Sequence, residues 1–259
     1  MIPPYPRKQW GQHFLHDPTI IYHLITAIAP VSGQHLIEIG PGKGALTLPL
    51  LQQSVKLDVI ELDPYLVKQL QPLTLSYPQL TVHHADALKF DFRTLVTDHQ
   101  PVRIVGNLPY NISTPLLFHL LTSADLIQDM MFMLQKEVVD RMIAMPATAN
   151  YGRLSVMLQY HCRIEKQFNV SPRAFYPPPQ VDSTVVHLLP YFTPPVALRD
   201  FNVFSQVVTQ AFSQRRKTLR NSLRGLLNET EIQQLGIDAQ RRPETLTLTE
   251  FARLANHLV

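Results

Sequence analysis

The first two thirds of the chain alternate short apolar runs with longer segments of helical periodicity. An apolar run of a few residues between turn signals is typical of a strand buried on both faces, as in parallel sheets that helices cover. Such runs predict strands over residues 36–39, 57–60, 80–84, 102–105, 130–134, 163–170 and 181–189. We therefore expect an α/β protein with a doubly wound, Rossmann-like sheet.

Connections between the runs refine this picture. A glycine-rich turn leads into a helix from about Ala45, and a second helix is predicted after Asp63. The last two strands are separated only by a proline-rich turn, Pro172 to Pro179, which is too short for a parallel crossover. We expect these two strands to pair antiparallel at one edge of the sheet.

Strand signals stop after Pro194-Pro195. The remaining periodicity predicts helices over residues 201–212, 215–227, a short stretch after Thr230, and 249–258. Because prolines and a change of period coincide, we place a domain boundary there. The prediction is a catalytic sheet domain over residues 1–195 and a small all-α domain over residues 196–259.

Composition excludes several classes of protein. With 45% hydrophobic and 17% charged residues in a chain of 259, disorder is excluded for most of its length. Cys162 is the only cysteine, so no disulfide can form within the chain, which fits a reducing compartment. No apolar run reaches the ~18 residues that cross a bilayer, and residues 1–11 lack the apolar stretch of a signal peptide. We expect a soluble cytoplasmic protein with no membrane partner.

Positive charge is concentrated near the C-terminus. Residues 1–195 hold equal numbers of basic and acidic side chains, so the net charge of +3 lies in residues 196–259. Five cations and no acid fall between residues 215 and 224: Arg215, Arg216, Lys217, Arg220 and Arg224. On the predicted helix the last three share a face opposite Leu219 and Leu223. A solvated helix face usually mixes both signs, so we favour contact with a nucleic-acid backbone.

A glycine-rich motif, Gly40-Pro41-Gly42-Lys43-Gly44, follows the strand over 36–39. Glycines at a strand-to-helix junction allow a tight turn and close approach of a ligand. The spacing differs from both the dinucleotide fingerprint and the P-loop, and glycines also occur there for packing alone. The motif by itself predicts only a nucleotide-like ligand.

Two acidic residues at later strand ends strengthen that interpretation. Glu61 ends the strand over 57–60, where a carboxylate can accept both hydroxyls of a ribose, and Asp86 follows the strand over 80–84, where it can accept from an adenine amine. Either acid could instead cap the next helix. Three polar features at successive strand ends favour a ligand crevice at the carboxyl edge of the sheet.

The segment Asn107-Leu108-Pro109-Tyr110 follows the strand over 102–105. The side-chain oxygen of Asn107 can accept from an exocyclic amine, and Pro109 favours an extended Leu108 whose carbonyl offers a second acceptor. The ring of Tyr110 can stack on a base. Alone, the segment is better interpreted as a strand-ending turn with a core tyrosine. With the preceding motifs, it predicts a site that positions an aromatic amine in front of an activated methyl group.

These segments, together with others, resemble the ribosomal RNA adenine dimethyltransferases, above all the bacterial members that act on the small-subunit (16S) RNA. The resemblance spans nearly the whole chain in order. The segments that carry it are residues 12–15, 38–47, 61–63, 86–87, 107–113, 135–138, 151–155, 175–183 and 215–221.

The resemblance implies an enzyme that transfers methyl groups from S-adenosylmethionine to two adjacent adenosines in the 3′-terminal hairpin loop of 16S rRNA, within the 30S subunit. A target adenine must be flipped out of its stack. The implied base-binding residues are Asn107, Leu108, Tyr110 and Phe175. The implied cofactor-binding residues are His13, Leu15, Gly40, Gly42, Glu61, Asp86, Ala87 and Asn107. A second role in ribosome biogenesis is also implied, and we take a monomer as the default.

One position departs from the family pattern, which has Asn where this chain has His13. A neutral imidazole offers one donor and one acceptor, but its reach differs from that of an amide. His13 could alternatively serve only the fold of the N-terminal segment.

Alternatives remain at this point. A large-subunit rRNA methylase of the macrolide-resistance type would share these motifs, and a non-catalytic assembly factor would keep only the RNA surface. A nicotinamide-dependent oxidoreductase is disfavoured by the glycine spacing. The histidines lack metal-ligand spacing, so no metal is predicted. Cys162 and the methionines of the strand over 130–134 are interpreted as core residues.

Overall fold

The structure is a computed structural model that describes residues 12–96 and 100–259. Contacts between residues divide the chain into two units. The first comprises the residues up to 139 together with 165–190, and the second comprises residues 140–164 and 191–259. Among the described residues, no helix combines the length and apolar character needed to cross a membrane.

A seven-stranded sheet forms the first unit, with the strand order β4-β3-β2-β5-β6-β9-β7. Its strands are β2 (His35–Ile39), β3 (Lys56–Glu61), β4 (Leu80–His84), β5 (Val102–Asn107), β6 (Ile127–Gln135), β7 (Cys162–Val170) and β9 (Ser183–Pro190). The pairs from β4 through β6 are parallel, and β9 pairs antiparallel with β6. All seven predicted strands are present, and the last two are neighbours at one end of the sheet.

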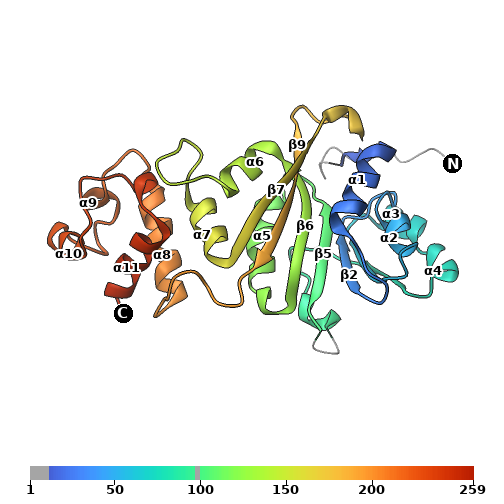
Figure 1. Cartoon of the computed structure of the whole chain (residues 1–259), viewed down its shortest axis with the longest axis horizontal. Helices are drawn as coiled ribbons and strands as arrows, with labels where there is room; N and C mark the ends of the chain where they lie inside the picture. Colours follow the sequence, from blue (N-terminus) through green and yellow to red (C-terminus); the bar gives the residue numbers. More distant parts are fainter. Residues whose placement is uncertain (1–11, 97–99) are drawn as a thin grey trace. The chain divides into compact units, whose positions relative to one another are not determined.

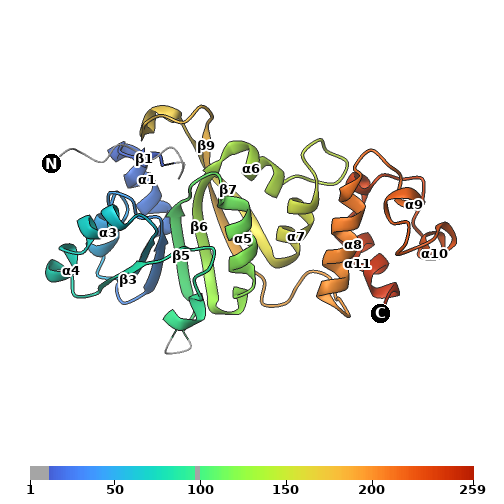
Figure 2. The ribbon, with the colours of Figure 1, turned by 180° about the vertical axis from the view of Figure 1, so that it is seen from behind.

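Helices connect the strands of this sheet. They are α1 (Pro18–Ile28), α2 (Thr47–Leu51), α3 (Pro64–Leu70), α4 (Leu73–Ser76), α5 (Ser113–Leu121) and α6 (Lys136–Met142). Helix α1 lies in front of the strands in Figure 1, whereas α5 lies in front in the opposite view of Figure 2, so the two helices cover opposite faces. Helix α3 begins where the sequence indicated, because Asp63 caps it and Pro64 occupies its first position.

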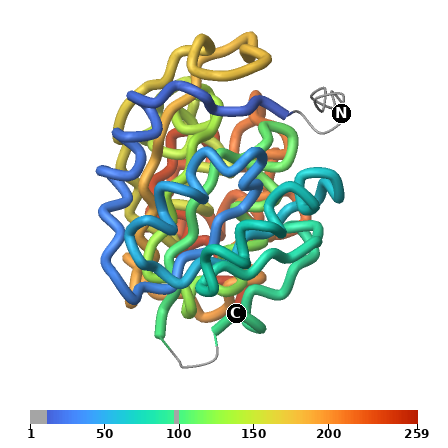
Figure 3. The backbone as a smooth tube through the Cα atoms, turned by 90° about the vertical axis from the view of Figure 1, so that its right-hand side faces the viewer, coloured from blue at the N-terminus to red at the C-terminus, as the bar shows by residue number. Residues whose placement is uncertain are grey.

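A small second sheet was not predicted. Strand β1 (Phe14–Leu15) pairs antiparallel with β8 (Phe175–Tyr176), with Phe14 opposite Tyr176 and Leu15 opposite Phe175. Figure 3 shows this N-terminal strand beside the loop that precedes β9. Two-residue strands carry no periodic signal, so only tertiary contact defines them.

The second unit is helical. It contains α7 (Arg153–His161), α8 (Phe201–Ser213), α9 (Leu219–Ser222), α10 (Glu229–Gln234) and α11 (Leu248–His257). Short 3₁₀ helices in the chain span Phe92–Leu95, Ala124–Leu126, Pro172–Ala174 and Pro243–Thr245. Helix α7 belongs here, N-terminal to the boundary predicted after residue 195, because its Tyr160 ring packs on Phe201 and Phe204 of α8.

The predicted helix over residues 215–227 is wrong. Residues 214–216 form a turn and only Leu219–Ser222 are helical. The amides of Leu219 and Arg220 donate to the carbonyls of Arg241 and Ala239 instead of to their own helix, and Gly225 has a φ of +95°. Leu219 and Leu223, which are spaced as on a helix, are nevertheless buried. A single helical turn is enough to bring two residues at this spacing to the same side of the chain.

Strands β2 and β5 leave no room for a side chain at Gly106. A Cβ atom at Gly106 would lie 2.5 Å from the carbonyl oxygen of Ile39, so no larger residue fits there. The strand order reverses between these two strands, since the chain runs outward from β2 to β4 and then returns to β5. Ligands of open α/β sheets bind at the carboxyl edge of such a reversal.

A buried ion pair ties the sheet to α1. Arg103 on β5 donates from Nε to Asp129 Oδ1 (2.7 Å) and from Nη2 to Asp129 Oδ2 (2.9 Å). It also donates to the carbonyl of Ile28 at the end of α1 (2.7 Å). Burial alone would raise the pKa of Asp129, but hydrogen bonds from His187 and Arg103 outweigh it and hold the pKa below its usual value. The cation thus satisfies both a buried carboxylate and a helix C-terminus.

We expect Arg103→Ala to lower the free energy of unfolding by about 3–5 kcal/mol, because Asp129 would stay buried without its main counter-charge. Urea denaturation followed by circular dichroism measures this loss. Arg93→Ala is the matched control, since Arg93 pairs with Asp125 in the same unit but at the surface, where such pairs contribute little. Equal losses in the two variants would contradict the prediction.

Candidate active site

A pocket lies at the carboxyl ends of β2, β3, β4 and β5, where the sheet order reverses. It holds about 1110 Å³ of space, including the solvent at its mouth. Most of the residues predicted to bind cofactor or base line it: His13, Leu15, Gly40, Gly42, Glu61, Asp86, Ala87, Asn107, Leu108 and Tyr110. The structure therefore brings together side chains that are up to 97 positions apart in the sequence.

The glycine-rich motif forms the turn that follows β2. Gly40 and Gly42 have φ values of +67° and +57°, which favour glycine. A Cβ atom at Gly42 would come within 3.1 Å of the Phe14 ring. The turn is thus packed against the Phe14 side chain of the N-terminal strand, which would have to shift slightly to admit a larger residue at position 42.

Glu61 is buried at the end of β3. Its Oε1 accepts from the amide of Asp63 (2.9 Å) and its Oε2 from the amide of Gly42 (3.2 Å). Burial raises the pKa of Glu61, although these two amides oppose the rise. The Leu62 amide also hydrogen-bonds this carboxylate, which has about four acceptor positions, so acceptor capacity remains for a donor such as a ribose hydroxyl.

Asp86 and Ala87 follow β4. One carboxylate oxygen of Asp86 accepts from the amide of Leu88 (3.0 Å), which stabilises a turn and not a helix. Asp86 and Ala87 nevertheless line the pocket, so this local bond and a ligand-facing position are compatible.

Asn107 is held by the N-terminal segment. Its Nδ2 donates to the backbone carbonyl of His13 (3.0 Å). Because a carbonyl can only accept, the amide nitrogen must face His13, and Oδ1 remains as an acceptor on the other side. The sequence predicted this acceptor but gave no sign of the bond that orients it.

His13 makes two further contacts. Its Nδ1 donates to the carbonyl of Pro177 (2.7 Å), and its ring stacks on Tyr110 with centroids 5.6 Å apart. The imidazole thus connects the N-terminal strand with the loop after β8 and with the predicted base-binding segment.

Tyr110 is fixed from several directions. Its hydroxyl hydrogen-bonds Ser183 Oγ (2.7 Å), and its carbonyl accepts from Ser113 Oγ (2.8 Å). Burial raises the pKa of Tyr110, and the Ser183 hydrogen bond opposes the rise. The adjoining Leu108 amide donates to Met133 on β6 (3.2 Å). The loop is therefore rigid before any ligand enters.

Phe175 does not line the pocket, in contrast to its predicted place over the base. It is 2% exposed and packs with Leu15 in the hydrophobic core. Alternation along β8 explains the difference: Phe175 points inward, whereas the next residue, Tyr176, is 60% exposed. In this arrangement the Phe175 ring has almost no surface to offer a base.

Glu38 was not singled out from the sequence, yet it lines the pocket. It is fully buried on β2 and accepts a hydrogen bond from Thr47 Oγ1 (2.6 Å). Burial raises its pKa from 4.5 to about 7; the Thr47 bond opposes the rise and the charge of Glu61 adds to it. An acid inside an otherwise apolar strand run was the signal that could have identified it.

The five predicted RNA-contacting cations lie in the second unit, and all are exposed. Arg215 donates to the carbonyl of Ala149, and Arg220 pairs with Glu229 at 3.4 Å. Arg220 and Arg224 line one hollow with Asn221 and Asn228, and the acids Glu229 and Glu231 line it as well. We call this group, Arg220, Asn221, Arg224 and Asn228, the basic hollow.

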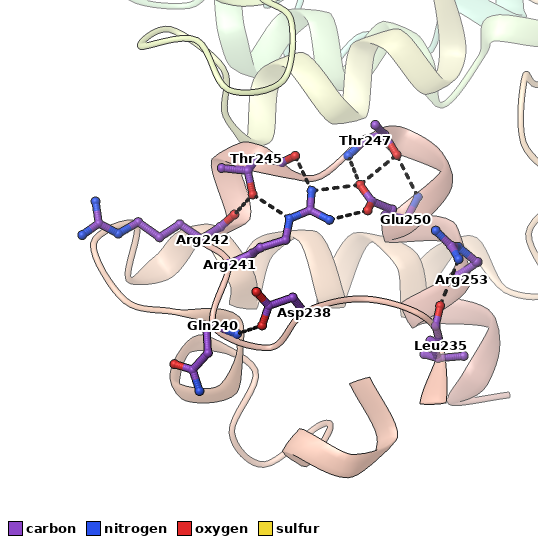
Figure 4. Close-up of polar contacts among 9 residues, drawn as sticks. All are labelled: Leu235, Asp238, Gln240, Arg241, Arg242, Thr245, Thr247, Glu250 and Arg253. Atoms are coloured by element: carbon purple, nitrogen blue, oxygen red, sulfur yellow. Dashed lines mark hydrogen bonds and ion pairs between the residues drawn. The ribbon is translucent and has the colours of Figure 1, made fainter. Parts of the chain in front are cut away.

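A half-buried clamp of Arg241 and Glu250 lies next to the start of α9. Arg241 donates two hydrogen bonds to the carboxylate of Glu250 on α11 (2.5 and 3.2 Å) and one to the carbonyl of Thr245 (2.6 Å), as Figure 4 shows. Its own carbonyl accepts from the Leu219 amide. The clamp therefore fixes the start of α9 even though the segment is not a long helix.

The cysteine and the histidines outside the pocket make contacts that serve the fold. Cys162 is buried at the start of β7, and burial raises the pKa of its thiol to about 12. His35 and His83 both hydrogen-bond the buried carboxylate of Asp58 (2.6 and 2.5 Å). Within residues 12–96 and 100–259, no group of three or more potential ligands is arranged to hold a metal.

Fold and pocket together define a methyltransferase of the Rossmann-like α/β class. The model of a family described as ribosomal RNA adenine dimethylase matches residues 5–259. Ribosomal RNA small subunit methyltransferase A of Pseudomonas syringae pv. tomato is 54% identical over 252 residues, covering 97% of this chain and 94% of the relative. The same-named protein of Pseudomonas aeruginosa is 53% identical with equal coverage. The chain belongs to the ribosomal RNA adenine dimethylase family.

Solved structures agree with this assignment. A dimethyladenosine transferase from Plasmodium falciparum is similar with a TM-score of 0.78 and 27% identity, covering 93% of this chain and 96% of the other. The 23S rRNA methyltransferase ErmE has a TM-score of 0.71 at 24% identity, covering 95% of this chain and 99% of the other, and supports the fold alone. The resemblance and the fold class inferred from the sequence are confirmed.

Glu38→Gln tests the protonation of this buried acid. In the wild type the folded state keeps the proton up to about pH 7, whereas the unfolded chain loses it near pH 4.5. The free energy of unfolding should therefore fall as pH rises from about 4.5 to 7. Glutamine keeps an acceptor for Thr47 and does not titrate, so the variant should lack this part of the fall. Thermal melts of both proteins across this range measure the difference; parallel curves would show that Glu38 ionises normally.

Proposed function

We propose that the protein is an S-adenosylmethionine-dependent 16S rRNA (adenine-N6,N6)-dimethyltransferase that modifies two adjacent adenosines in the 3′-terminal hairpin loop of the small subunit. The observation that carries the proposal is the orientation of Asn107. Its amide nitrogen is occupied by the carbonyl of His13, so an acceptor oxygen remains at a pocket that Tyr110 also lines.

The pocket residues fit the cofactor. Glu61 retains acceptor positions for ribose hydroxyls, Asp86 can accept from an adenine amine, and the turn at Gly40 and Gly42 leaves the backbone open to close approach. The sulfonium of bound cofactor supplies an electrophilic methyl carbon. Every other contribution to catalysis comes from the positions of the protein's own groups.

Asn107 and Leu108 would hold the target amine. Acceptance of its N–H groups by Asn107 Oδ1 and the Leu108 carbonyl would direct the lone pair of the nitrogen toward the methyl carbon that a bound cofactor would supply. Stacking on Tyr110 would fix the plane of the flipped ring. A loop that is already rigid avoids the entropy cost of forming this geometry during binding.

The second unit would supply affinity for RNA. Exposed cations at the basic hollow suit phosphates, which position an RNA but do not specify its sequence. Selection of the target would come from the shape of the hairpin loop and from the pocket. Curated relatives that are about half identical to this chain are named as small-subunit enzymes, which favours the small subunit over the large one.

Replacement of Asn107 by Ala should reduce methyl incorporation by about 100-fold or more, since one preorganised polar contact at a reacting centre is worth that much. Labelled cofactor with purified, unmethylated small subunits measures the rate. The affinity of the variant for small subunits should change little. Asn202→Ala, which replaces an exposed residue, is the control. Unchanged activity would show that Asn107 is not the amine acceptor.

The same assay with the wild type separates the alternative functions. Methyl incorporation into large subunits only would favour a large-subunit methylase, and binding without incorporation would favour an assembly factor.

The double replacement of Arg220 and Arg224 by Ala should weaken subunit binding and reduce the salt dependence of log Kd by about two, since each phosphate contact contributes about one. Titrations at several salt concentrations measure the slope. Arg93→Ala removes an exposed cation from the other unit and serves as the control. An unchanged slope would exclude the basic hollow from the RNA contact.

A further inference from the structure

The two faces of the small β1–β8 sheet differ in what they contact. Directly opposed residues of an antiparallel pair lie on the same face. Leu15 and Phe175 are opposed, and both are buried, with 6% and 2% of their surface exposed. Phe14 and Tyr176 are the other opposed pair and therefore share the outer face, where Tyr176 is 60% exposed.

This outer face adjoins the pocket. Phe14 lines the pocket and is seated on Gly42, so the face begins at the pocket rim. Lys43, which is exposed, places its Nζ 4.8 Å from the centre of the Phe14 ring. Phe14 thus lies opposite Tyr176 in the strand pair and beside Lys43, and we call these two rings and the cation the outer platform.

The outer platform is held in place before any ligand binds. The amide of His16 donates to the carbonyl of Ala174 at one end of the strand pair (3.0 Å), and the imidazole of His13 donates to the carbonyl of Pro177 at the other (2.7 Å). Tyrosine also has few rotatable bonds, so a ring on this backbone loses little entropy when a ligand covers it.

We propose that the outer platform binds a nucleotide that flanks the target adenine, with its base stacked on Tyr176 and its phosphate near Lys43. Exposed rings beside a cation are the combination with which proteins bind single-stranded nucleic acid, since every base has a face to stack. The cation favours RNA over an apolar peptide, which would desolvate Lys43 without compensation. The inference rests on the proposed function and assigns Tyr176 to a flanking base, which is distinct from the target base that Phe175 was predicted to cover.

The test uses the full chain and an RNA hairpin whose loop carries two adjacent adenosines, with 2-aminopurine at single flanking positions. Stacking on Tyr176 quenches the fluorescence of 2-aminopurine at one of these positions. Tyr176→Ala should abolish that quenching and raise Kd about tenfold, whereas Tyr176→Phe should retain both. Tyr22→Ala, which removes a ring of similar exposure from α1, should bind as the wild type does. Thermal melts establish that each variant is folded.

An abasic substitution at the quenched position completes the comparison. The wild type should bind the abasic RNA as weakly as Tyr176→Ala binds the intact RNA. Tyr176→Ala should bind the two RNAs with the same affinity. Wild-type affinity in Tyr176→Ala, or equal quenching in both proteins, would overturn the inference. These readouts do not require methyl transfer, so RNA binding with Tyr176-dependent quenching but no methylation would contradict the proposed function alone. A wild type that binds no hairpin would overturn the inference, whereas the proposed function is tested separately with small subunits.

Discussion

The close approach of β2 and β5 decides where the functional residues of the first unit lie. Glycine is the only type of residue that fits at position 106 between the two backbones, because any Cβ atom there would collide with the carbonyl of Ile39. The order of strands reverses at this pair, so their carboxyl ends open a crevice and not a continuous surface. The glycine turn follows β2 and Asn107 ends β5, so both lie at that crevice and line the same pocket.

Chemistry at the pocket depends on groups whose surroundings are fixed by the rest of the sheet. Asn107 offers an acceptor because its nitrogen is already used, and Tyr110 offers a ring because its hydroxyl and backbone are already bonded. The buried pair of Arg103 and Asp129 holds α1 to β5 and β6 below them. Stability and site geometry are therefore provided by different residues of the same strands.

Much of this arrangement could be predicted from the sequence. Apolar runs identified the central strands β2, β3, β5 and β6, because a strand buried on both faces leaves an almost uninterrupted local signal. Strand β7 was also predicted, although most of its residues are not buried. Polar residues directly after those runs identified Glu61, Asp86 and Asn107, since parallel strands end at a common edge. The predictions that failed concern contacts between distant segments. Leucines at helical spacing indicated a helix over residues 215–227, but backbone bonds to Arg241 and Ala239 hold that region as turns. Likewise, nothing local revealed that the pairing of β8 with β1 turns Phe175 inward and Tyr176 outward.

His13 has a consequence that reaches beyond its own contacts. Its carbonyl orients Asn107, its ring covers part of Tyr110, and its imidazole nitrogen holds the loop at Pro177. Docking of the N-terminal strand and assembly of the amine-binding geometry are consequently one event and not two. A chain in which that strand is detached would keep its sheet and its crevice, yet it would have an Asn107 amide free to rotate and so no defined acceptor for the incoming nitrogen.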